Sequence, residues 1–175
     1  MALAALVLQI LLGGWTSTNY AAVACPDFPT CQGSFLPRTD FKDAFVLWRG
    51  LGVDYEGGVL APPARTAIHY AHRIGAVLAG LLLVAVAVAG WRRAQTPGVR
   101  AAAAAVGAAV AVQWLIGMNL IWQGFPLALG TAHNAGAALL LLATVTLLRQ
   151  LWPGGPDIGF TTASGRRSSL PPRAT

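Results

Sequence analysis

The sequence predicts an all-α fold: a polytopic membrane four-helix bundle with a long outer loop between its first and second helices. Two observations support this prediction. Hydrophobic residues make up 55% of the 175 residues and charged residues only 10%, which is far from the composition of water-soluble domains. The hydrophobic residues also gather in long uncharged runs, each near the roughly 20 residues that a helix needs to cross a bilayer.

The apolar runs give the expected bounds of the transmembrane helices. The second run follows Pro62 and Pro63, and proline favours the first turn of a helix over its interior. The fourth run stops at Pro153 and Gly154. We therefore expect one transmembrane domain over residues 1–152, with helices at about 2–15, 67–90, 101–122 and 127–152 and an outer loop over 16–66.

Basic residues at the ends of the apolar runs predict the orientation of the bundle. Loop 91–100 contains three arginines and no acidic residue, and tail 153–175 contains three more arginines. Loop 16–66 holds five of the six acidic residues. Because short cytoplasmic loops carry an excess of Lys and Arg, both termini are expected in the cytoplasm and loop 16–66 outside a bacterial inner (cytoplasmic) membrane. The basic residues behind the net charge of +6 are therefore interpreted as signals for orientation in the lipid membrane, and no nucleic-acid partner is expected.

Two segments outside the apolar runs have patterns of their own. Phe41, Phe45 and Trp48 recur at helical spacing between a cap-like Thr39 or Asp40 and Gly50, which predicts a short helix in the membrane interface. Tail 153–175 is rich in Gly, Pro and Ser and has little to bury, so we expect a disordered cytoplasmic tail.

Both cysteines of the chain, Cys25 and Cys31, lie in the outer loop within the stretch CPDFPTC. Their spacing can close a small loop, and a disulfide is expected on the oxidising side of the membrane. The chain has no CxxCH motif, so covalent heme attachment is not indicated. The sequence leaves open whether the bond is a structural staple or a redox-active pair.

All three histidines of the chain lie in expected transmembrane helices, where an ionisable side chain is costly and usually faces the bundle interior or a ligand. His72 is about 7.5 Å into its helix and His133 about 9 Å into its helix, at about 1.5 Å per residue. Both helices descend from the outer surface. The two imidazoles are therefore expected at nearly equal depth, where one metal centre could lie between them.

Two imidazoles leave a zinc ion short of ligands, and no carboxylate or thiolate is expected at that depth. A heme brings its own nitrogen ligands, so two axial histidines complete its iron. We predict a heme b (iron protoporphyrin IX) with His72 and His133 as the axial iron ligands. The alternative is a pair of buried histidines that bond to neighbouring groups. Small residues lie one turn from each histidine, as close approach of a flat macrocycle requires: Gly75, Ala76, Ala79, Gly130, Gly136 and Ala137.

Three further residues are candidates for the same site. His69 shares a helix face with His72, and it is either a cofactor-binding residue or a hydrogen-bonding group in the outer pocket. Arg73 could pair with heme propionates, since a guanidinium binds carboxylates in a bidentate manner. Arg65 is a second candidate for that role. Ordinary anchoring of both arginines at the membrane interface is the alternative.

Four sequence blocks between Leu11 and Leu151 resemble the heme A synthase family, the CtaA-type proteins that convert heme O to heme A for terminal oxidases. The blocks are LGGWTSTNYAAVACPDFPTCQG, DYEGGVL, AIHYAHRIGA and TAHNAGAALLL, in that order. The family consists of two similar four-helix halves, and this chain resembles the C-terminal half. The resemblance places the family's heme b ligands on His72 and His133 and its outer-loop cysteine pair on Cys25 and Cys31.

The resemblance implies a role in heme A biosynthesis for cytochrome oxidase assembly. In the family, the other half binds the heme O substrate and carries a carboxylate implicated in oxidation of the heme O methyl group to formyl. No Asp or Glu lies in the expected transmembrane helices here. We therefore expect either the heme b-binding half of a heme A synthase, as a fragment or one subunit of a split enzyme, or a non-enzymatic bis-histidine b-type cytochrome or heme-holding assembly factor.

A third hypothesis is a bundle that packs without heme. The partners implied by the resemblance are the heme O substrate, once a second half completes the site, and heme O synthase or oxidase assembly factors. A second copy of the chain is a further candidate partner.

Overall fold

The computed structural model describes residues 1–50 and 58–152. Within these residues the elements are α1 (Ala2–Thr18), the 3-10 helix η1 (Ala22–Ala24), α2 (Phe41–Ala44), α3 (Pro62–Arg93), α4 (Pro97–Trp122) and α5 (Leu127–Leu151). The β pairing in this part of the chain is one isolated bridge between Cys31 and Ser34. The all-α prediction is confirmed. The expected disordered tail 153–175 lies outside the described residues, as does segment 51–57 of the outer loop.

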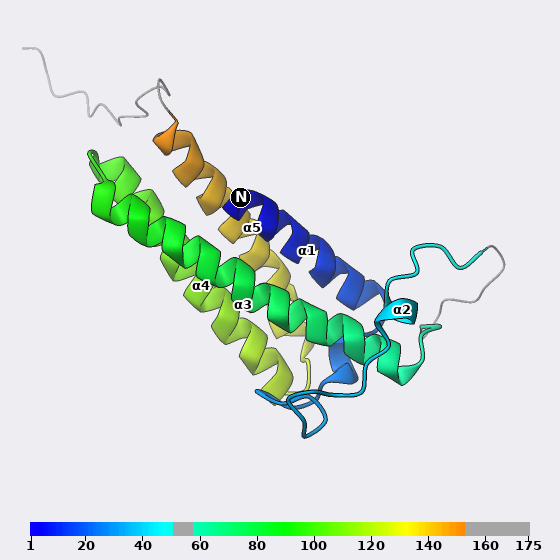
Figure 1. Ribbon diagram of the computed structural model, residues 1–175. Coiled ribbons are helices and arrows are strands. Elements are labelled where there is room, and N and C mark those ends of the chain that lie inside the picture. The colour runs from blue at the N-terminus through cyan, green and yellow to red at the C-terminus, as the bar shows by residue number, and fades with distance from the viewer. Residues whose placement is uncertain (51–57, 153–175) are drawn as a thin grey trace, which may run out of the picture.

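The four long helices run side by side as a bundle (Figure 1), in which α3 packs against both α1 and α4, and α4 packs against α5. The outer loop and the α4–α5 turn lie at one end of the bundle, which we call the loop end. The α3–α4 turn and the C-terminal end of α5 lie at the opposite end. This arrangement agrees with the side that the sequence analysis assigns to each loop relative to the others.

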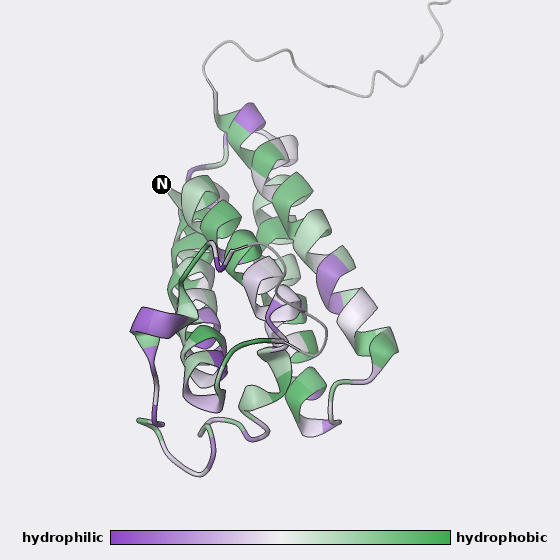
Figure 2. Ribbon diagram, turned by 90° about the vertical axis from the view of Figure 1, so that its right-hand side faces the viewer, coloured by the Kyte–Doolittle hydropathy of each residue, from purple (hydrophilic) through white to green (hydrophobic). Residues whose placement is uncertain are grey.

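Helices α3, α4 and α5 are each long and apolar enough to cross a membrane, with 32, 26 and 25 residues. Helix α1 is apolar but has only 17 residues, so its predicted crossing stays a prediction. Hydrophobic residues dominate the long helices and polar residues gather around the loop end (Figure 2). Large apolar side chains such as Leu78, Leu115 and Leu139 are exposed on the outer faces of the bundle, where lipid would cover them.

Helix α3 begins at Pro62 rather than at the expected residue 67 and ends at Arg93 rather than at 90. Pro62 and Pro63 occupy its first turn, where a missing N–H costs nothing because the helix has no partner for it there. Helix α4 begins at Pro97 rather than at 101, because Thr96 caps it by accepting from the Val99 N–H at 3.3 Å. The apolar runs predicted the part of each helix that lies in the hydrocarbon region, but they did not include the polar ends of α3 and α4.

Helix α1 also extends beyond its expected end at residue 15, to Thr18. The hydroxyl groups of Thr16, Ser17 and Thr18 each donate to a backbone carbonyl four residues earlier, at 2.8–3.2 Å. These bonds satisfy hydroxyl groups within the helix, so polar residues extend it past the apolar run.

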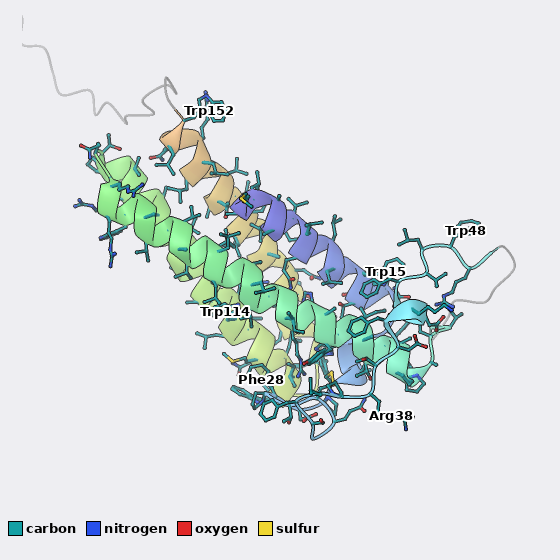
Figure 3. The ribbon with its side chains drawn as sticks, viewed as in Figure 1. Trp15, Phe28, Arg38, Trp48, Trp114 and Trp152 are labelled. Carbon is teal, nitrogen blue, oxygen red and sulfur yellow. A yellow bond between two sulfur atoms is a disulfide. The ribbon has the colours of Figure 1, made fainter. Side chains whose placement is uncertain are left out.

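The helix expected after residue 40 is present but short, and its position in the membrane interface stays a prediction. Helix α2 follows Asp40, whose carboxylate accepts from the Asp43 N–H at 3.0 Å, and it ends at Ala44. The rings of Phe41 and Phe45 stack with centroids 6.5 Å apart. Trp48 lies beyond the helix and is 73% exposed at the loop end, while Trp152 marks the opposite end (Figure 3).

Two buried clusters hold the structure together. One lies between the long helices in the half away from the loop and is apolar throughout, with Leu83, Val106 and Leu147 at its centre. The other lies under the outer loop and joins Ala44 of α2 to Ala64 and Ile68 of α3. The second cluster fixes the outer loop against the first turns of α3, and the histidines lie close to it along the helix.

Candidate functional site

His72 on α3 and His133 on α5 are both half-buried and lie near the loop end, where both helices begin. Helices α3 and α5 contact each other. The two residues proposed as ligands thus lie on two helices that contact each other, and their pairing on one iron stays a prediction.

The imidazole of His72 is held against helix α1. The amide nitrogen of Gln9 lies 2.9 Å from His72 Nδ1 and donates to the His72 carbonyl oxygen at 3.0 Å. A methyl group placed on Gly13 would lie 3.2 Å from His72 Cε1, so the edge of the ring lies against the α1 backbone. Bulkier residues at position 13 would displace the ring.

The imidazole of His133 is held against helix α4 in a similar way. The amide nitrogen of Gln113 donates to the His133 carbonyl oxygen at 2.8 Å, and a methyl group on Gly117 would lie 3.3 Å from His133 Cε1. Among the described residues, His133 Nδ1 and Gln113 Oε1 are both buried without a hydrogen-bond partner. Burying a polar atom without a hydrogen-bond partner costs free energy of folding. Both atoms can therefore each take one further hydrogen-bond partner.

These residues fit a heme. In the part of the chain that the structure describes, no hydrogen bond involves Nε2 of either His72 or His133, so both atoms are free to bind iron. Over the same residues, no group of three or more His, Cys, Asp or Glu side chains could hold a metal ion unaided. A heme needs only the two axial nitrogens from the protein. When bound it would supply electron-transfer chemistry between the two histidines.

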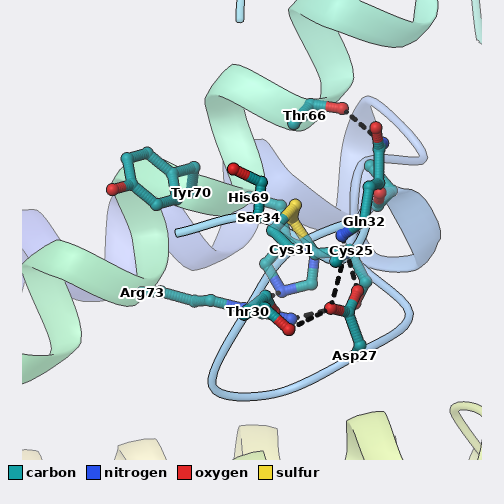
Figure 4. The surroundings of a disulfide bond; sticks show 12 residues. Cys25, Asp27, Thr30, Cys31, Gln32, Ser34, Thr66, His69, Tyr70 and Arg73 are labelled. Atoms are coloured by element: carbon teal, nitrogen blue, oxygen red, sulfur yellow. Dashed lines mark hydrogen bonds between the residues drawn. A yellow bond between two sulfur atoms is a disulfide. The ribbon is translucent and has the colours of Figure 1, made fainter. Parts of the chain in front are cut away.

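Arg73 is committed to the outer loop. Its guanidinium donates to the backbone carbonyls of Thr30 at 2.7 Å and Cys25 at 2.9 Å, and its Nε donates to His69 Nε2 at 3.2 Å. The guanidinium also lies 5.7 Å from the centroid of the Phe28 ring. Arg73 thus ties the disulfide loop to α3 one residue beyond His72 (Figure 4). Guanidinium hydrogens remain for a carboxylate, so the predicted propionate contact stays a prediction.

His69 is 5% exposed and accepts a hydrogen bond from Arg73, with its ring edge-on to Phe125 at 6.3 Å between centroids. This geometry matches the hydrogen-bonding role that the sequence analysis left open for it. Arg65 is half-buried, and its side chain makes no hydrogen bond or ion pair with another described residue.

The expected disulfide between Cys25 and Cys31 is present, and both residues are buried. Asp27 organises the loop that the bond closes: its carboxylate accepts from the Thr30 hydroxyl, from the Gly33 N–H at 2.9 Å and from the Gln32 N–H at 2.6 Å. The Thr30 hydroxyl, and then the Gly33 N–H, lower the pKa of Asp27 below its usual value of 3.8. Figure 4 shows these bonds beside the cystine.

Four residues that hold the imidazoles were not among the residues predicted from the sequence: Gln9, Gly13, Gln113 and Gly117. A signal for them exists in the sequence: QILLG at residues 9–13 and QWLIG at 113–117 share a Gln and a Gly at the same spacing. Each pair precedes a histidine block of the form HxxGA, at His72 and at His133. The two copies are separated by unequal loops, which hides the repeat from a search at one fixed period.

Fold and site together define an all-α integral membrane protein with one histidine on each of two facing helices. The family model for cytochrome oxidase assembly proteins (COX15-CtaA) matches residues 1–145. The chain therefore belongs to that family.

Named relatives are similar to this chain over part of their length. A heme A synthase from Shewanella oneidensis is 40% identical over 147 residues, which cover 84% of this chain and 44% of the relative. A heme A synthase from Caulobacter vibrioides is 34% identical over 140 residues, which cover 79% of this chain and 37% of the relative. The chain thus spans less than half the length of these relatives. No solved structure matches it significantly.

Proposed function

We propose that this chain is the heme b-binding half of a heme A synthase, with His72 and His133 as the axial ligands of the heme iron. The observation that carries the proposal is the pair of half-buried imidazoles on α3 and α5, each with a free Nε2 and each lying against a glycine of a neighbouring helix. The similarity to proteins named heme A synthase supports heme as the cofactor and heme A biosynthesis for cytochrome oxidase assembly as the role.

In the complete synthase, the heme O methyl group would be oxidised to formyl: the carbon would take one oxygen atom from water, and four protons and four electrons would leave, the electrons to an acceptor outside this chain. The residues of this chain would hold the heme b that takes part in electron transfer. They would not supply the base, because α1, α3, α4 and α5 contain no Asp or Glu. We assign the heme O site to the part of the relatives that this chain does not match, or to a second copy of the chain.

A spectrum of the purified chain tests the proposal. The chain is expressed in a membrane, purified in detergent, and its heme is extracted and typed. We expect a six-coordinate low-spin b-type spectrum with one heme b for each chain. A chain that carries no heme, or that binds heme through one histidine, would overturn the ligand assignment.

The absence of an acidic residue from the long helices favours a second candidate function, a bis-histidine cytochrome or heme-holding assembly factor. Expression alone and together with an N-terminal half from a relative separates the two. We expect heme b without conversion of heme O in the first case, and heme A production in the second. If cells that express both chains bind heme b but make no heme A, the non-enzymatic function would be favoured.

The proposed orientation has the loop end outside the membrane and both chain termini in the cytoplasm. It rests on the arginines at the opposite end, among them Arg92 and Arg93 at the end of α3 and Arg149 near the end of α5. Membrane-impermeant thiol reagents would label Cys25 and Cys31 from the outer side, after reduction only. Labelling from the cytoplasmic side would invert the orientation. Heme O synthase, oxidase assembly factors and a second copy of the chain remain the proposed protein partners.

A further inference from the structure

The two histidines lie in two copies of the same helix-pair arrangement. In the first pair, α1 presents Gln9 and Gly13 to His72 of α3; in the second, α4 presents Gln113 and Gly117 to His133 of α5. A third contact repeats as well. A methyl group on Gly75, three residues after His72, would lie 2.3 Å from Gln9 Oε1, and a methyl group on Gly136 would lie 2.3 Å from Gln113 Oε1.

The repeated contacts leave each glutamine little freedom. One side of each amide lies against a glycine of the histidine-bearing helix, and the amide nitrogen donates to the carbonyl oxygen of the histidine itself. That carbonyl belongs to the helix backbone, so the bond fixes the amide relative to the helix axis. In the first pair the same amide nitrogen also lies 2.9 Å from His72 Nδ1. In the second pair His133 Nδ1 is buried without a hydrogen-bond partner among the described residues.

The chemistry of an axial histidine requires a partner at this position. A neutral imidazole that binds iron through Nε2 carries its proton on Nδ1, and that N–H needs an acceptor when it is buried. An amide oxygen is such an acceptor. Gln113 Oε1 is buried and unpaired among the described residues, as is His133 Nδ1, so one donor and one acceptor on neighbouring groups each need a partner.

Gln9 can meet the same requirement by turning its amide. As described, its nitrogen faces His72 Nδ1, which suits an unprotonated Nδ1. Half a turn about the last side-chain torsion would bring the oxygen to the same place, which suits a protonated Nδ1 and exchanges the bond to the His72 carbonyl oxygen for a bond from the imidazole. A glutamine serves both states because its amide has a donor end and an acceptor end, whereas an aliphatic side chain of similar size serves neither.

We infer that Gln9 and Gln113 are positioning residues for the heme ligands: each amide orients one imidazole and supplies the hydrogen-bond acceptor for its Nδ1–H. The inference rests on the proposed function. Together with Gly13 and Gly117, which lie against the Cε1 edges, the amides set the planes of the two rings. Ring orientation and the strength of the Nδ1–H bond both tune the iron, so the glutamines act on its potential and its affinity.

The test replaces each glutamine by leucine and by glutamate in the purified 175-residue chain with its heme bound. The readouts are the midpoint potential, the electron paramagnetic resonance spectrum of the ferric heme and the rate of heme transfer to apomyoglobin. For Gln9→Leu and Gln113→Leu we expect a raised potential, because a histidine without its acceptor is a weaker electron donor. We also expect an altered low-spin spectrum and heme loss that is faster by about 10- to 100-fold.

Gln9→Glu and Gln113→Glu keep the shape and an acceptor for Nδ1–H but lose the donor to the histidine carbonyl. We expect these variants to retain heme and to have a lowered potential. This opposite sign separates an effect through the imidazole from loss of packing. Thr144→Val is the matched control, because the Thr144 hydroxyl is buried and donates to the Leu140 carbonyl within α5, away from both histidines. We expect wild-type values in all three readouts for this control.

The outcomes are distinguishable. Wild-type values of potential, spectrum and heme transfer in both leucine variants, with heme b still bound, would overturn the positioning role and leave the proposed function standing. Equal changes in the leucine variants and in Thr144→Val would also overturn it, since general loss of packing would then explain them. A wild-type chain that binds no heme would overturn the proposed function and this inference together.

Discussion

The helix pair α1–α3 and the helix pair α4–α5 hold their histidines through the same contacts but are connected in different ways. A long outer loop joins α1 to α3, while a short turn with Gly124 and Phe125 at positive φ joins α4 to α5. The outer loop folds back onto α3 and is tied there by Arg73, the residue that follows His72. Asn134, the residue that follows His133, is exposed.

Contacts that hold an imidazole can be distinguished from contacts that hold the outer loop when the two helix pairs are compared. The glutamine and glycine contacts occur in both pairs, so they belong to the support of the imidazole. The Arg73 contacts occur in one pair only among the described residues, so they belong to the outer loop. Changes at the repeated contacts should therefore affect both histidines alike, and changes at Arg73 should act on the α1–α3 side first.

The largest expected effect is loss of either histidine. His72→Ala and His133→Ala should each abolish the low-spin b-type spectrum, because each removes one of two axial ligands. Absorption spectra of the purified variants measure this. His69→Ala is the control and should have a smaller effect, since His69 bonds to Arg73. A six-coordinate spectrum that survives in either of the first two variants would contradict the equivalence of the two pairs.

Arg73→Gln should loosen the outer loop. It removes charged donors from the carbonyls of Cys25 and Thr30, and hydrogen bonds to charged groups contribute about 1.5–3 kcal/mol each. We expect faster proteolysis of the loop and a lower unfolding temperature in detergent. Asn134→Gln is the matched control on α5, where an exposed substitution should change stability by no more than about 0.5 kcal/mol. Similar losses in both variants would break the comparison.

Gly13→Ala should move the His72 ring without removing it. The added methyl group would lie 3.2 Å from Cε1, so the imidazole must shift by a few tenths of an ångström. We expect a changed ferric electron paramagnetic resonance spectrum with heme retained, and a similar change in Gly117→Ala. Gly14→Ala is the control, because no atom lies within 4 Å of the added group. An unchanged spectrum in Gly13→Ala would show that the ring does not depend on this contact.

The smallest expected effect is a pH dependence of the disulfide loop. The pKa of Asp27 is lowered in the folded chain by the Thr30 hydroxyl and then by the Gly33 N–H. The ionised carboxylate therefore stabilises the loop fully above the usual value of 3.8, and this stabilisation is lost as the pH falls through the lower folded pKa. Hydrogen exchange at the Gln32 and Gly33 amides should accelerate over that range. Asp27→Asn should exchange faster at neutral pH and show less of the pH dependence.

The all-α class, the four apolar segments and the cystine could be predicted from the amino-acid sequence, whereas the pairing of His72 with His133 at similar depth stays a prediction. These properties follow from composition and from distance along single helices, both of which can be read from one chain. The start of α3 at Pro62 and the shortness of α2 were missed because polar helix ends depend on capping and on contacts with neighbours.

The contacts of each side chain could not be predicted from the sequence. The partners Gln9 and Gln113 lie on different helices from the histidines they contact, and no pattern within one helix fixes which faces meet. Arg73 could have extended toward the bundle or toward the loop, and its direction was set by carbonyls that the disulfide loop places beside it. Contacts between helices depend on how the helices pack, and packing is a property of the assembled bundle.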